Sequence, residues 1–303
     1  MTDLSVDLGF CILKNPVIAA SGTFGYGLEF QPFLDLNRLG GFVVKGLYYD
    51  PRPGNPPPRL FETAGGLINA IGLQGIGVER FAEEVLPKLQ GLESALIINV
   101  CGDHEEEYAM VVDHLNGLEG ITAYELNISC PNVKQGGRCP AMDPDATFRI
   151  VKEVKKISRR PLITKLTPNA ADITEVAVSA QEAGSDALSL VNTFLALAVD
   201  AESRRPALAN VLGGLSGPAI KPLALRMVYQ VAARVSVPVI GMGGITSGTD
   251  AAEFLIAGAS AVQVGTANFV DPQATLNIIS ELEDYGRRHN IKKITELIGT
   301  LKT

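Results

Sequence analysis

The chain has 303 residues, of which 46% are hydrophobic and 19% charged, with 31 glycines and four cysteines. This composition supports a large core and argues against a disordered or fibrous chain. The net charge of −7 argues against nucleic-acid binding, because a phosphate backbone requires a basic face.

Eight short apolar runs recur along the chain, each followed by a loop and a segment with helical spacing. Runs rich in Val and Ile and bounded by Gly, Pro or Asn predict strands that are buried on both faces. In chain order they are Pro16–Ser21, Gly41–Lys45, Ala95–Val100, Ala123–Ile128, Pro161–Leu166, Ala187–Val191, Val237–Gly241 and Ala261–Val264. Between them, Ala170–Ala183 and Gly248–Ala257 are predicted helices, because each is followed by a glycine that can end it.

Eight consecutive β-α units predict an α/β fold, a (β/α)8 TIM barrel, formed by a single domain over residues 1–303. The alternative is an open, doubly wound sheet, for which the sequence offers no obvious edge or switch point. Two inserts, residues 47–75 and 193–217, are longer than a barrel requires and are expected to be active-site lids or binding loops. Within the first insert, residues 50–59 (DPRPGNPPPR) fit a rigid surface turn equally well.

Polar residues stand at several predicted strand ends, which meet at one mouth of the barrel. They include Lys45, Asn99, Asn127, Lys165 and Asn192. A lone polar residue in an apolar run is more often a structural group with a partner. Five of them converging predict a bound polar ligand, because a buried amide or ammonium is costly unless it is paired.

Glycines follow the last two predicted strands. Gly243-Gly244 and Gly265-Thr266 each precede a helix, where backbone N–H groups favour an anion. A phosphate site after strands seven and eight recurs in this type of barrel. Because no GxGxxG follows the first strand, a mononucleotide flavin fits better than a dinucleotide. Lys165 would then place positive charge near the electron-accepting end of the flavin ring.

The four cysteines differ in their sequence context. In ELNISCPNV (residues 125–133), Cys130 follows the fourth strand and precedes a proline that turns the chain, which favours a general base or nucleophile. Cys11 and Cys101 are predicted to be inert and buried. Cys139 is expected to be exposed and sensitive to oxidation. No CxxC occurs, which argues against a zinc or iron–sulfur site on this chain.

The sequence also predicts the cellular compartment and the location of the three histidines. Few cysteines beside a large core indicate a reduced, cytoplasmic protein. No basic and apolar leader begins the sequence and no run of about 20 apolar residues occurs, so we expect no membrane contact. His104, His114 and His289 are predicted to be surface residues.

Motifs along nearly the whole chain resemble those of the dihydroorotate dehydrogenase family. They are NPVIAASGTFGYG, VVKG, GNPPPRLFET, LINAIGLQ, ELNISCPNV, KLTPN, VNT, GGLSGPAIKP, IGMGGI and AVQVGTANF. The chain most resembles the class 1B catalytic subunit. The resemblance implies oxidation of dihydroorotate to orotate in pyrimidine (UMP) biosynthesis, with FMN as hydride acceptor. It also implies a partner subunit that carries FAD and a 2Fe–2S cluster and reduces NAD, in a heterotetramer of two catalytic and two electron-transfer subunits.

The same resemblance assigns roles residue by residue. Cys130 matches the catalytic base, which takes the C5 proton of the substrate while a hydride leaves C6 for flavin N5. Flavin-contacting positions match Ser21, Lys45, Gly46, Asn99, Asn127, Lys165, Val191, Gly217, Gly243, Gly244, Gly265 and Thr266. Substrate-binding positions match Lys45, Asn69, Ala70, Ile71, Gly72, Leu73, Asn127, Asn192 and Thr193. The loop after Cys130 reads GGRCPAMD where relatives often read GGxAFG, a departure that bears on loop closure and on Cys139.

Three alternatives remain beside this reading. A class 1A-like homodimer would use fumarate as the electron acceptor. A lyase would form a Schiff base on Lys45 or Lys165. A barrel without catalytic activity would bind a nucleotide or a partner and turn nothing over.

Overall fold

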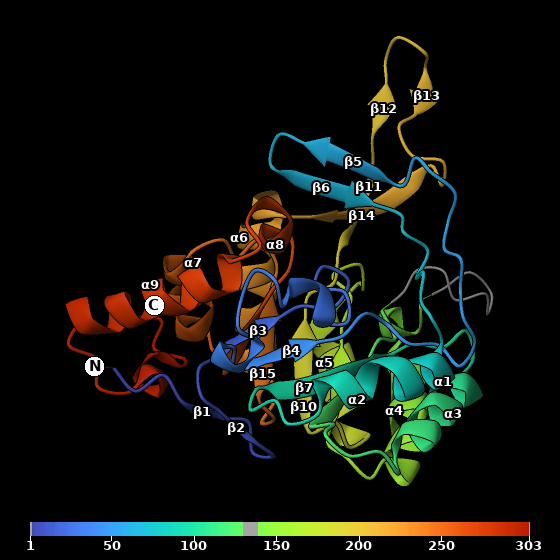
Figure 1. Ribbon diagram of the computed structural model, residues 1–303. Coiled ribbons are helices and arrows are strands. Elements are labelled where there is room, and N and C mark those ends of the chain that lie inside the picture. The colour runs from blue at the N-terminus through green and yellow to red at the C-terminus, as the bar shows by residue number, and fades with distance from the viewer. Residues whose placement is uncertain (1, 130–138, 303) are drawn as a thin grey trace.

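Eight parallel strands close into a barrel at the centre of the molecule (Figure 1). The structure is a computed structural model that describes residues 2–129 and 139–302. Around the barrel the strands are β3 (Val17–Ala19), β4 (Gly41–Val43), β7 (Ala95–Val100), β8 (Ala123–Leu126), β9 (Leu162–Lys165), β10 (Ala187–Leu190), β15 (Val239–Met242) and β16 (Ala261–Val264). The last strand pairs with the first, with Val262 opposite Val17. This closure confirms the TIM barrel, and the open-sheet alternative was wrong.

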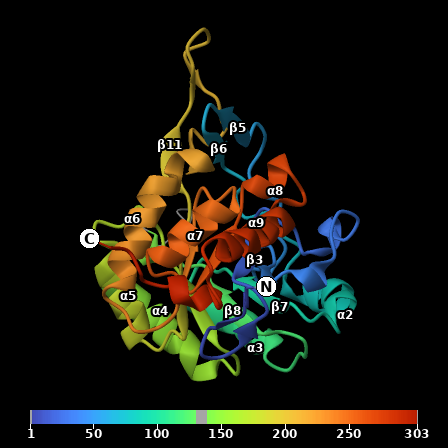
Figure 2. The same cartoon turned by 90° about the vertical axis from the view of Figure 1, so that its left-hand side faces the viewer.

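All eight barrel strands are buried along their whole length. Each corresponds to one of the predicted strands, with ends that differ by a few residues. Their continuous apolar runs arise because helices cover the outside of the barrel while side chains fill its inside. Figure 2 shows α4, α5, α6, α7 and α9 on this outer face.

The helices follow the strands in the expected β-α order. They are α1 (Val78–Arg80), a π-helical segment (Phe81–Val85), α2 (Leu86–Leu89), α3 (Glu105–Leu115), α4 (Pro144–Ile157), α5 (Ile173–Glu182), α6 (Lys221–Ala232), α7 (Gly248–Ile256), α8 (Ala267–Val270) and α9 (Ala274–Arg288). Short 3-10 turns cover Leu28–Phe30, Leu36–Arg38, Pro140–Met142, Pro218–Ile220 and Ile294–Leu297. The helix predicted from Ala170 begins at Ile173, because the Asp172 side chain caps it by accepting from Thr174 N.

The two long inserts pair with each other beside the barrel, which the sequence analysis did not anticipate. The first supplies β5 (Leu60–Thr63) and β6 (Gly66–Asn69), and the second supplies β11 (Phe194–Leu197) and β14 (Leu212–Ser216). They form an antiparallel sheet in the order β11-β14-β6-β5. A hairpin of β12 (Val199–Asp200) and β13 (Arg205–Pro206) projects beyond this sheet (Figure 1). The inserts are therefore a structured sheet rather than free loops.

The start of the described chain lies against the segment that follows α9. Asp3 N donates to Lys292 O and Ile294 N donates to Asp3 O. A short hairpin of β1 (Val6–Asp7) and β2 (Ile12–Leu13) follows the first of these contacts. Among residues 2–129 and 139–302, no helix combines the length and the apolar character needed to cross a membrane.

Candidate active site

Three of the predicted asparagines form one hydrogen-bonded chain at the carboxyl ends of the strands. Asn192 Nδ2 donates to Ser129 Oγ over 2.6 Å, and Ser129 Oγ donates to Asn127 Oδ1 over 2.7 Å. Asn127 Nδ2 donates to Asn99 Oδ1 over 3.2 Å. Asn99 Nδ2 in turn donates to Glu125 Oε1 over 2.7 Å. The chain therefore runs from the barrel interior to the exit of β10, and it fixes the orientation of each amide.

A carboxylate that the sequence analysis missed anchors this chain. Glu125 is completely buried and also accepts hydrogen bonds from Ser189 Oγ (2.9 Å) and Gln263 Nε2 (2.7 Å). Its Oε1 lies 3.5 Å from Lys165 Nζ, which donates to Ser21 Oγ over 3.0 Å. The available signal was a glutamate inside an apolar strand run, because a buried charge requires a partner. Lys165 and Ser21, both predicted site residues, are thus hydrogen-bonded to each other beside Glu125.

Lys45 differs from Lys165 because, among the described residues, no carboxylate lies within ion-pair distance of its ammonium. Its side chain is half-buried, and in the part of the chain that the structure describes its ammonium makes no hydrogen bond or ion pair. Burial lowers the pKa of Lys45 below its ordinary 10.5, and the nearby charge of Arg59 lowers it further, while Glu29 acts in the opposite direction. A desolvated cation without a partner is a ready site for an anionic ligand.

Backbone donors at the exits of β15 and β16 are also unpaired. Within residues 2–129 and 139–302, the N–H groups of Gly243, Gly244, Gly265 and Thr266 donate no hydrogen bond. Gly243 and Gly244 have positive φ angles of 126° and 76°, which side chains disfavour. Gly217 lies beside these glycines. A Cβ built on Gly244 would lie 2.9 Å from the Gly217 carbonyl oxygen. Four free donors in one place fit a phosphate.

The N-terminus of α7 does not contribute to that cradle, contrary to the helix-dipole argument. Asp250 accepts from Thr246 N (2.8 Å) and Ser247 N (2.9 Å), and Glu281 accepts from Gly248 N (2.6 Å). The chain's own carboxylates therefore occupy this helix end. An anion at Gly243-Gly244 would depend on the loop N–H groups instead.

The expected substrate segment, residues 69–73, lies in the insert sheet and the turn that follows it. Asn69 Nδ2 donates to Gly214 O over 3.2 Å, and Gly214 also packs against Thr193. Residues 50–59 brace the segment, since Asn55 N donates to Ile71 O (2.9 Å) and Asn55 Nδ2 to Ala70 O (3.0 Å). Sheet pairing thus brings the two inserts together beside the barrel mouth. Gly72 and Leu73 complete the turn with positive φ angles of 73° and 55°.

The remaining flavin positions lie at the same strand ends. Val191 is buried and its N–H donates to Met242 O over 3.0 Å. A Cβ on Gly46 would lie 3.0 Å from Asn99 Oδ1, so this glycine lets the chain pass close to the asparagine chain. Cys130 lies outside the described residues, and its role stays a prediction.

The other cysteines are not available as nucleophiles. Cys139 was expected to be exposed, and this was wrong. It is 4% exposed and its Sγ donates to Ile128 O over 3.1 Å, because the chain returns to the core at this point. Cys101 is buried as predicted, whereas Cys11 is only half-buried. Burial raises the pKa of the Cys11 thiol to about 11, which keeps it protonated and inert.

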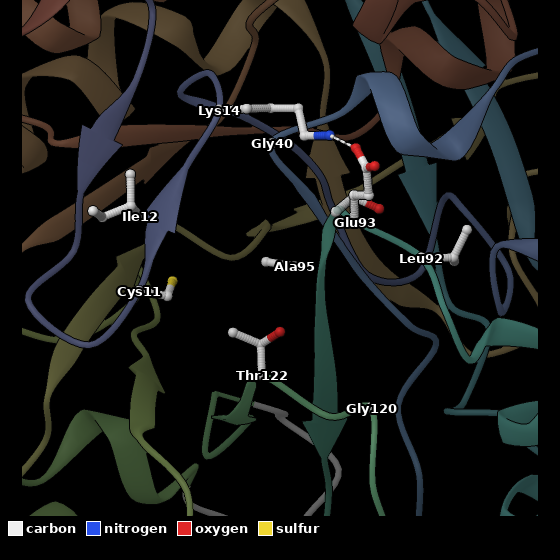
Figure 3. Close-up of a pocket in the computed structure, with 10 residues that line it drawn as sticks. Cys11, Ile12, Lys14, Gly40, Leu92, Glu93, Ala95, Gly120 and Thr122 are labelled. Atoms are coloured by element: carbon white, nitrogen blue, oxygen red, sulfur yellow. Dashed lines mark hydrogen bonds and ion pairs between the residues drawn. The ribbon is translucent and has the colours of Figure 1, made fainter.

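A separate cavity of about 280 Å³ lies at the opposite end of the barrel (Figure 3). It is lined by residues that precede strands, such as Gly40, Ser94 and Thr122, with the Lys14–Glu93 ion pair at 3.0 Å beside it. In TIM barrels this N-terminal face serves stability and the C-terminal face serves catalysis. We therefore do not assign the active site to this cavity. The three histidines are exposed, as predicted.

Replacing Gly244 with alanine is expected to weaken flavin binding by about fivefold to a hundredfold. The new Cβ would lie 2.8 Å from Lys221 N and 2.9 Å from Gly217 O, at a φ of 76°. Such strain costs about 1–3 kcal/mol and must displace one of the free donors. Fluorescence titration of the stripped chain with FMN measures the change. Gly91→Ala is the matched control, because it has a φ of 81° with open space around it. Equal affinity in the Gly244 variant would contradict the cradle.

Together, the closed barrel, the polar strand exits and the free donors define a (β/α)8 barrel whose C-terminal mouth carries unsatisfied donors that suit anionic groups. The family comparison agrees with this class. A family model described as dihydroorotate dehydrogenase matches residues 4–285. The chain belongs to the dihydroorotate dehydrogenase family and is an oxidoreductase. Membership in this family excludes the lyase and the non-catalytic barrel.

Related proteins match over nearly the full length. A Solibacter usitatus protein assigned as dihydroorotate dehydrogenase A (fumarate) is 57% identical over 96% of this chain and 95% of its own. Catalytic subunits of dihydroorotate dehydrogenase B (NAD+) from Geobacter and Bacteroides thetaiotaomicron are 52% and 50% identical, covering 99% and 100% of this chain and 98% and 100% of their own. A crystal structure of the Eimeria tenella dihydroorotate dehydrogenase has a TM-score of 0.81 at 23% identity, covering 98% of this chain and 88% of that one, which supports the fold alone.

Proposed function

We propose that this chain oxidises (S)-dihydroorotate to orotate with FMN, as the catalytic subunit of an NAD-linked dihydroorotate dehydrogenase in de novo pyrimidine biosynthesis. The observation that carries the proposal is a set of unsatisfied donors at one barrel mouth. The Lys45 ammonium and four backbone N–H groups have no partner among the described residues. Two anionic groups, a carboxylate and a phosphate, would satisfy them.

FMN, when bound, supplies the hydride acceptor. The free N–H groups after β15 and β16 suit its phosphate, and Lys165 suits the end of the ring that gains negative charge. We assign the flavin contacts to Ser21, Lys45, Gly46, Asn99, Asn127, Lys165, Val191, Gly217, Gly243, Gly244, Gly265 and Thr266. The buried hydrogen bonds of Asn99 and Lys165 hold these two side chains in place before the flavin arrives.

The substrate is a planar anion with several amide edges. Lys45 supplies a positive charge for its carboxylate, and asparagine amides offer both donors and acceptors for its ring. We assign substrate binding to Lys45, Asn69, Ala70, Ile71, Gly72, Leu73, Asn127, Asn192 and Thr193. Cys130, which follows Ser129 in the chain, is assigned as the base that removes the C5 proton.

We further propose that electrons leave through a second subunit that carries FAD and a 2Fe–2S cluster, in a heterotetramer of two subunits of each kind. The names of the Geobacter and Bacteroides relatives, catalytic subunits of NAD+-linked enzymes, support this partner. Among the described residues, no three His, Cys, Asp or Glu side chains form a group that could hold a metal ion. We propose that the chain acts as one domain in the cytoplasm.

The test is an anaerobic titration of the purified chain, whose visible spectrum reports any bound flavin. Addition of dihydroorotate is expected to bleach the flavin absorbance, and NAD is expected to remain oxidised until the partner subunit is added. A flavin that stays oxidised would overturn the substrate. A chain that does not bind FMN would overturn the proposal as a whole.

A class 1A-like homodimer is the second candidate, favoured by the 57% identical relative assigned as a fumarate enzyme. The two candidates differ in how the reduced flavin is reoxidised. Rapid reoxidation by fumarate without a partner would establish the homodimer. Slow reoxidation by fumarate, together with co-purification of a reductase subunit, would establish the NAD-linked enzyme.

Orotate affinity is expected to fall as pH rises through the pKa of Lys45, which burial and the Arg59 charge place below the ordinary 10.5. The affinity falls because deprotonation of Lys45 removes the positive charge that binds the orotate carboxylate. Above that pKa, the affinity is expected to fall by about tenfold per pH unit. Flavin spectral titration with orotate measures it. The Cys130→Ala background removes the titration of that thiol.

Lys45→Arg in the same background is the control, since guanidinium stays charged throughout this range. The alkaline fall is expected to disappear in this variant. A fall that persists unchanged would assign the titration to a different group.

A further inference from the structure

Glu125 is a buried residue that contacts two proposed flavin-binding residues but is not itself assigned to the site. It lies at the centre of β8, completely buried, with Asn99 directly opposite on β7. Among the described residues, the four polar groups that face its carboxylate can all donate a hydrogen bond. Asn99 and Lys165 face Oε1, while Ser189 and Gln263 face Oε2. The surroundings are therefore built to hold a carboxylate with its negative charge.

Two of these four neighbours are proposed flavin contacts. Lys165 lies between Glu125 Oε1 at 3.5 Å and Ser21 Oγ at 3.0 Å, with a side chain only 6% exposed. Asn99 donates to the same oxygen over 2.7 Å. A change at Glu125 therefore reaches the flavin pocket through both residues, although Glu125 itself has no exposed surface with which to touch a ligand.

The charges of Glu125 and Lys165 determine how a change at Glu125 would affect reduction of the flavin. A lone ammonium beside the flavin would favour the reduced, more negative form of the ring. A buried carboxylate paired to that ammonium opposes this effect, because the pair together carries no net charge. We infer that Glu125 is a positioning residue that holds Lys165 and Asn99 in place and offsets the Lys165 charge, and so lowers the reduction potential of the bound flavin. This inference rests on the proposed FMN site.

The structure also indicates that the test variant will fold. Gln263 Oε1 has no hydrogen-bond partner within the described residues. In Glu125→Gln, rotation of the Gln263 amide would present this oxygen to the new NH2 group. Asn99 can still donate to the remaining carbonyl oxygen, and the Ser189 hydroxyl can accept from the new NH2 group. Neutralising the carboxylate therefore changes charge with little change in shape.

The experiment measures the midpoint potential of bound FMN anaerobically against a reference dye. Glu125→Gln is expected to raise the preference for reduced over oxidised flavin about tenfold, which is about 30 mV for a two-electron couple. Lys165→Met is expected to lower it by a similar factor. The double variant is expected to return to within about threefold of wild type, because both charges are gone.

Ser189→Ala is the matched control, since it removes one hydrogen bond to the same carboxylate and leaves the charge. Its potential is expected to stay within about twofold of wild type, or about 9 mV. A Glu125→Gln potential that is unchanged or lower would overturn the inference. If that variant does not bind flavin, the double variant must still lie about tenfold above Lys165→Met. Equal potentials there would overturn the inference too.

The failure of the proposed function is distinguishable from the failure of this inference. If the wild-type chain binds no FMN, both the proposed function and the inference about Glu125 are wrong. If wild type binds FMN and dihydroorotate bleaches it, but the four potentials do not follow the predicted order, the proposed function stands and the role of Glu125 does not.

Discussion

Replacing Cys130 with alanine is expected to slow reduction of the bound flavin by dihydroorotate by about 10²- to 10⁴-fold, the usual contribution of a positioned general base. The reason is that the C5 proton then loses its assigned acceptor. Flavin content and orotate affinity are expected to change little, because the assigned flavin and orotate contacts do not include this thiol. Anaerobic stopped-flow measurement of flavin bleaching gives the rate directly.

Serine at the same position is a useful second variant. A hydroxyl is a weaker base than a thiol, so Cys130→Ser is expected to be slow at neutral pH and to regain rate as pH rises. Cys11→Ala is the control, because that thiol lies beside the cavity at the opposite end of the barrel and its raised pKa keeps it protonated. If the flavin of Cys130→Ala is reduced at the wild-type rate, another residue is the base.

Replacing Lys45 with methionine is expected to lower kcat/KM for the reductive half-reaction by about two to three orders of magnitude. The half-buried ammonium forms no ion pair in the described chain, so it can pair with the substrate carboxylate. Without it, that carboxylate would be desolvated and unpaired, which costs more than the hydrogen bond itself. The loss is expected in orotate affinity as well as in rate.

Stopped-flow reduction over a range of dihydroorotate concentrations separates binding from chemistry for Lys45→Met. Lys14→Met is the matched control, because Lys14 is paired to Glu93 on the opposite face of the barrel. Lys45→Arg is expected to recover part of the rate, since it restores the charge with a different shape. Unchanged kcat/KM in Lys45→Met would assign the carboxylate to another cation, with Arg59, whose charge acts on Lys45, as a candidate.

Most of the barrel could be predicted because its signals are local. Runs such as Ala95–Val100 are apolar throughout, since both faces of a barrel strand are covered. The strand-end residues Asn99, Asn127 and Lys165 could be grouped because parallel strands in a barrel bring their carboxyl ends together. The roles assigned to them, and to Cys130, come from family resemblance and stay predictions.

Other features depended on contacts between distant parts of the chain. β6 and β14 pair although about 145 residues separate Asn69 from Gly214, and neither insert has a strand pattern strong enough to indicate this alone. Cys139 was expected to be exposed, yet its Sγ donates to the Ile128 carbonyl in the core. The N-terminus of α7 looked free, yet Asp250 and Glu281 occupy it.

The sequence by itself determined the number of barrel strands, the end of the barrel that carries the polar residues and the family to which the chain belongs. These follow from periodicity and from motifs, which need no knowledge of distant contacts. Only the tertiary structure decided which lysine has a partner. Glu125 pairs with Lys165 on the neighbouring strand, while Lys45 forms no ion pair among the described residues. Electrostatic pairing depends on distances of a few ångströms in the folded barrel, and spacing along the chain does not fix those distances.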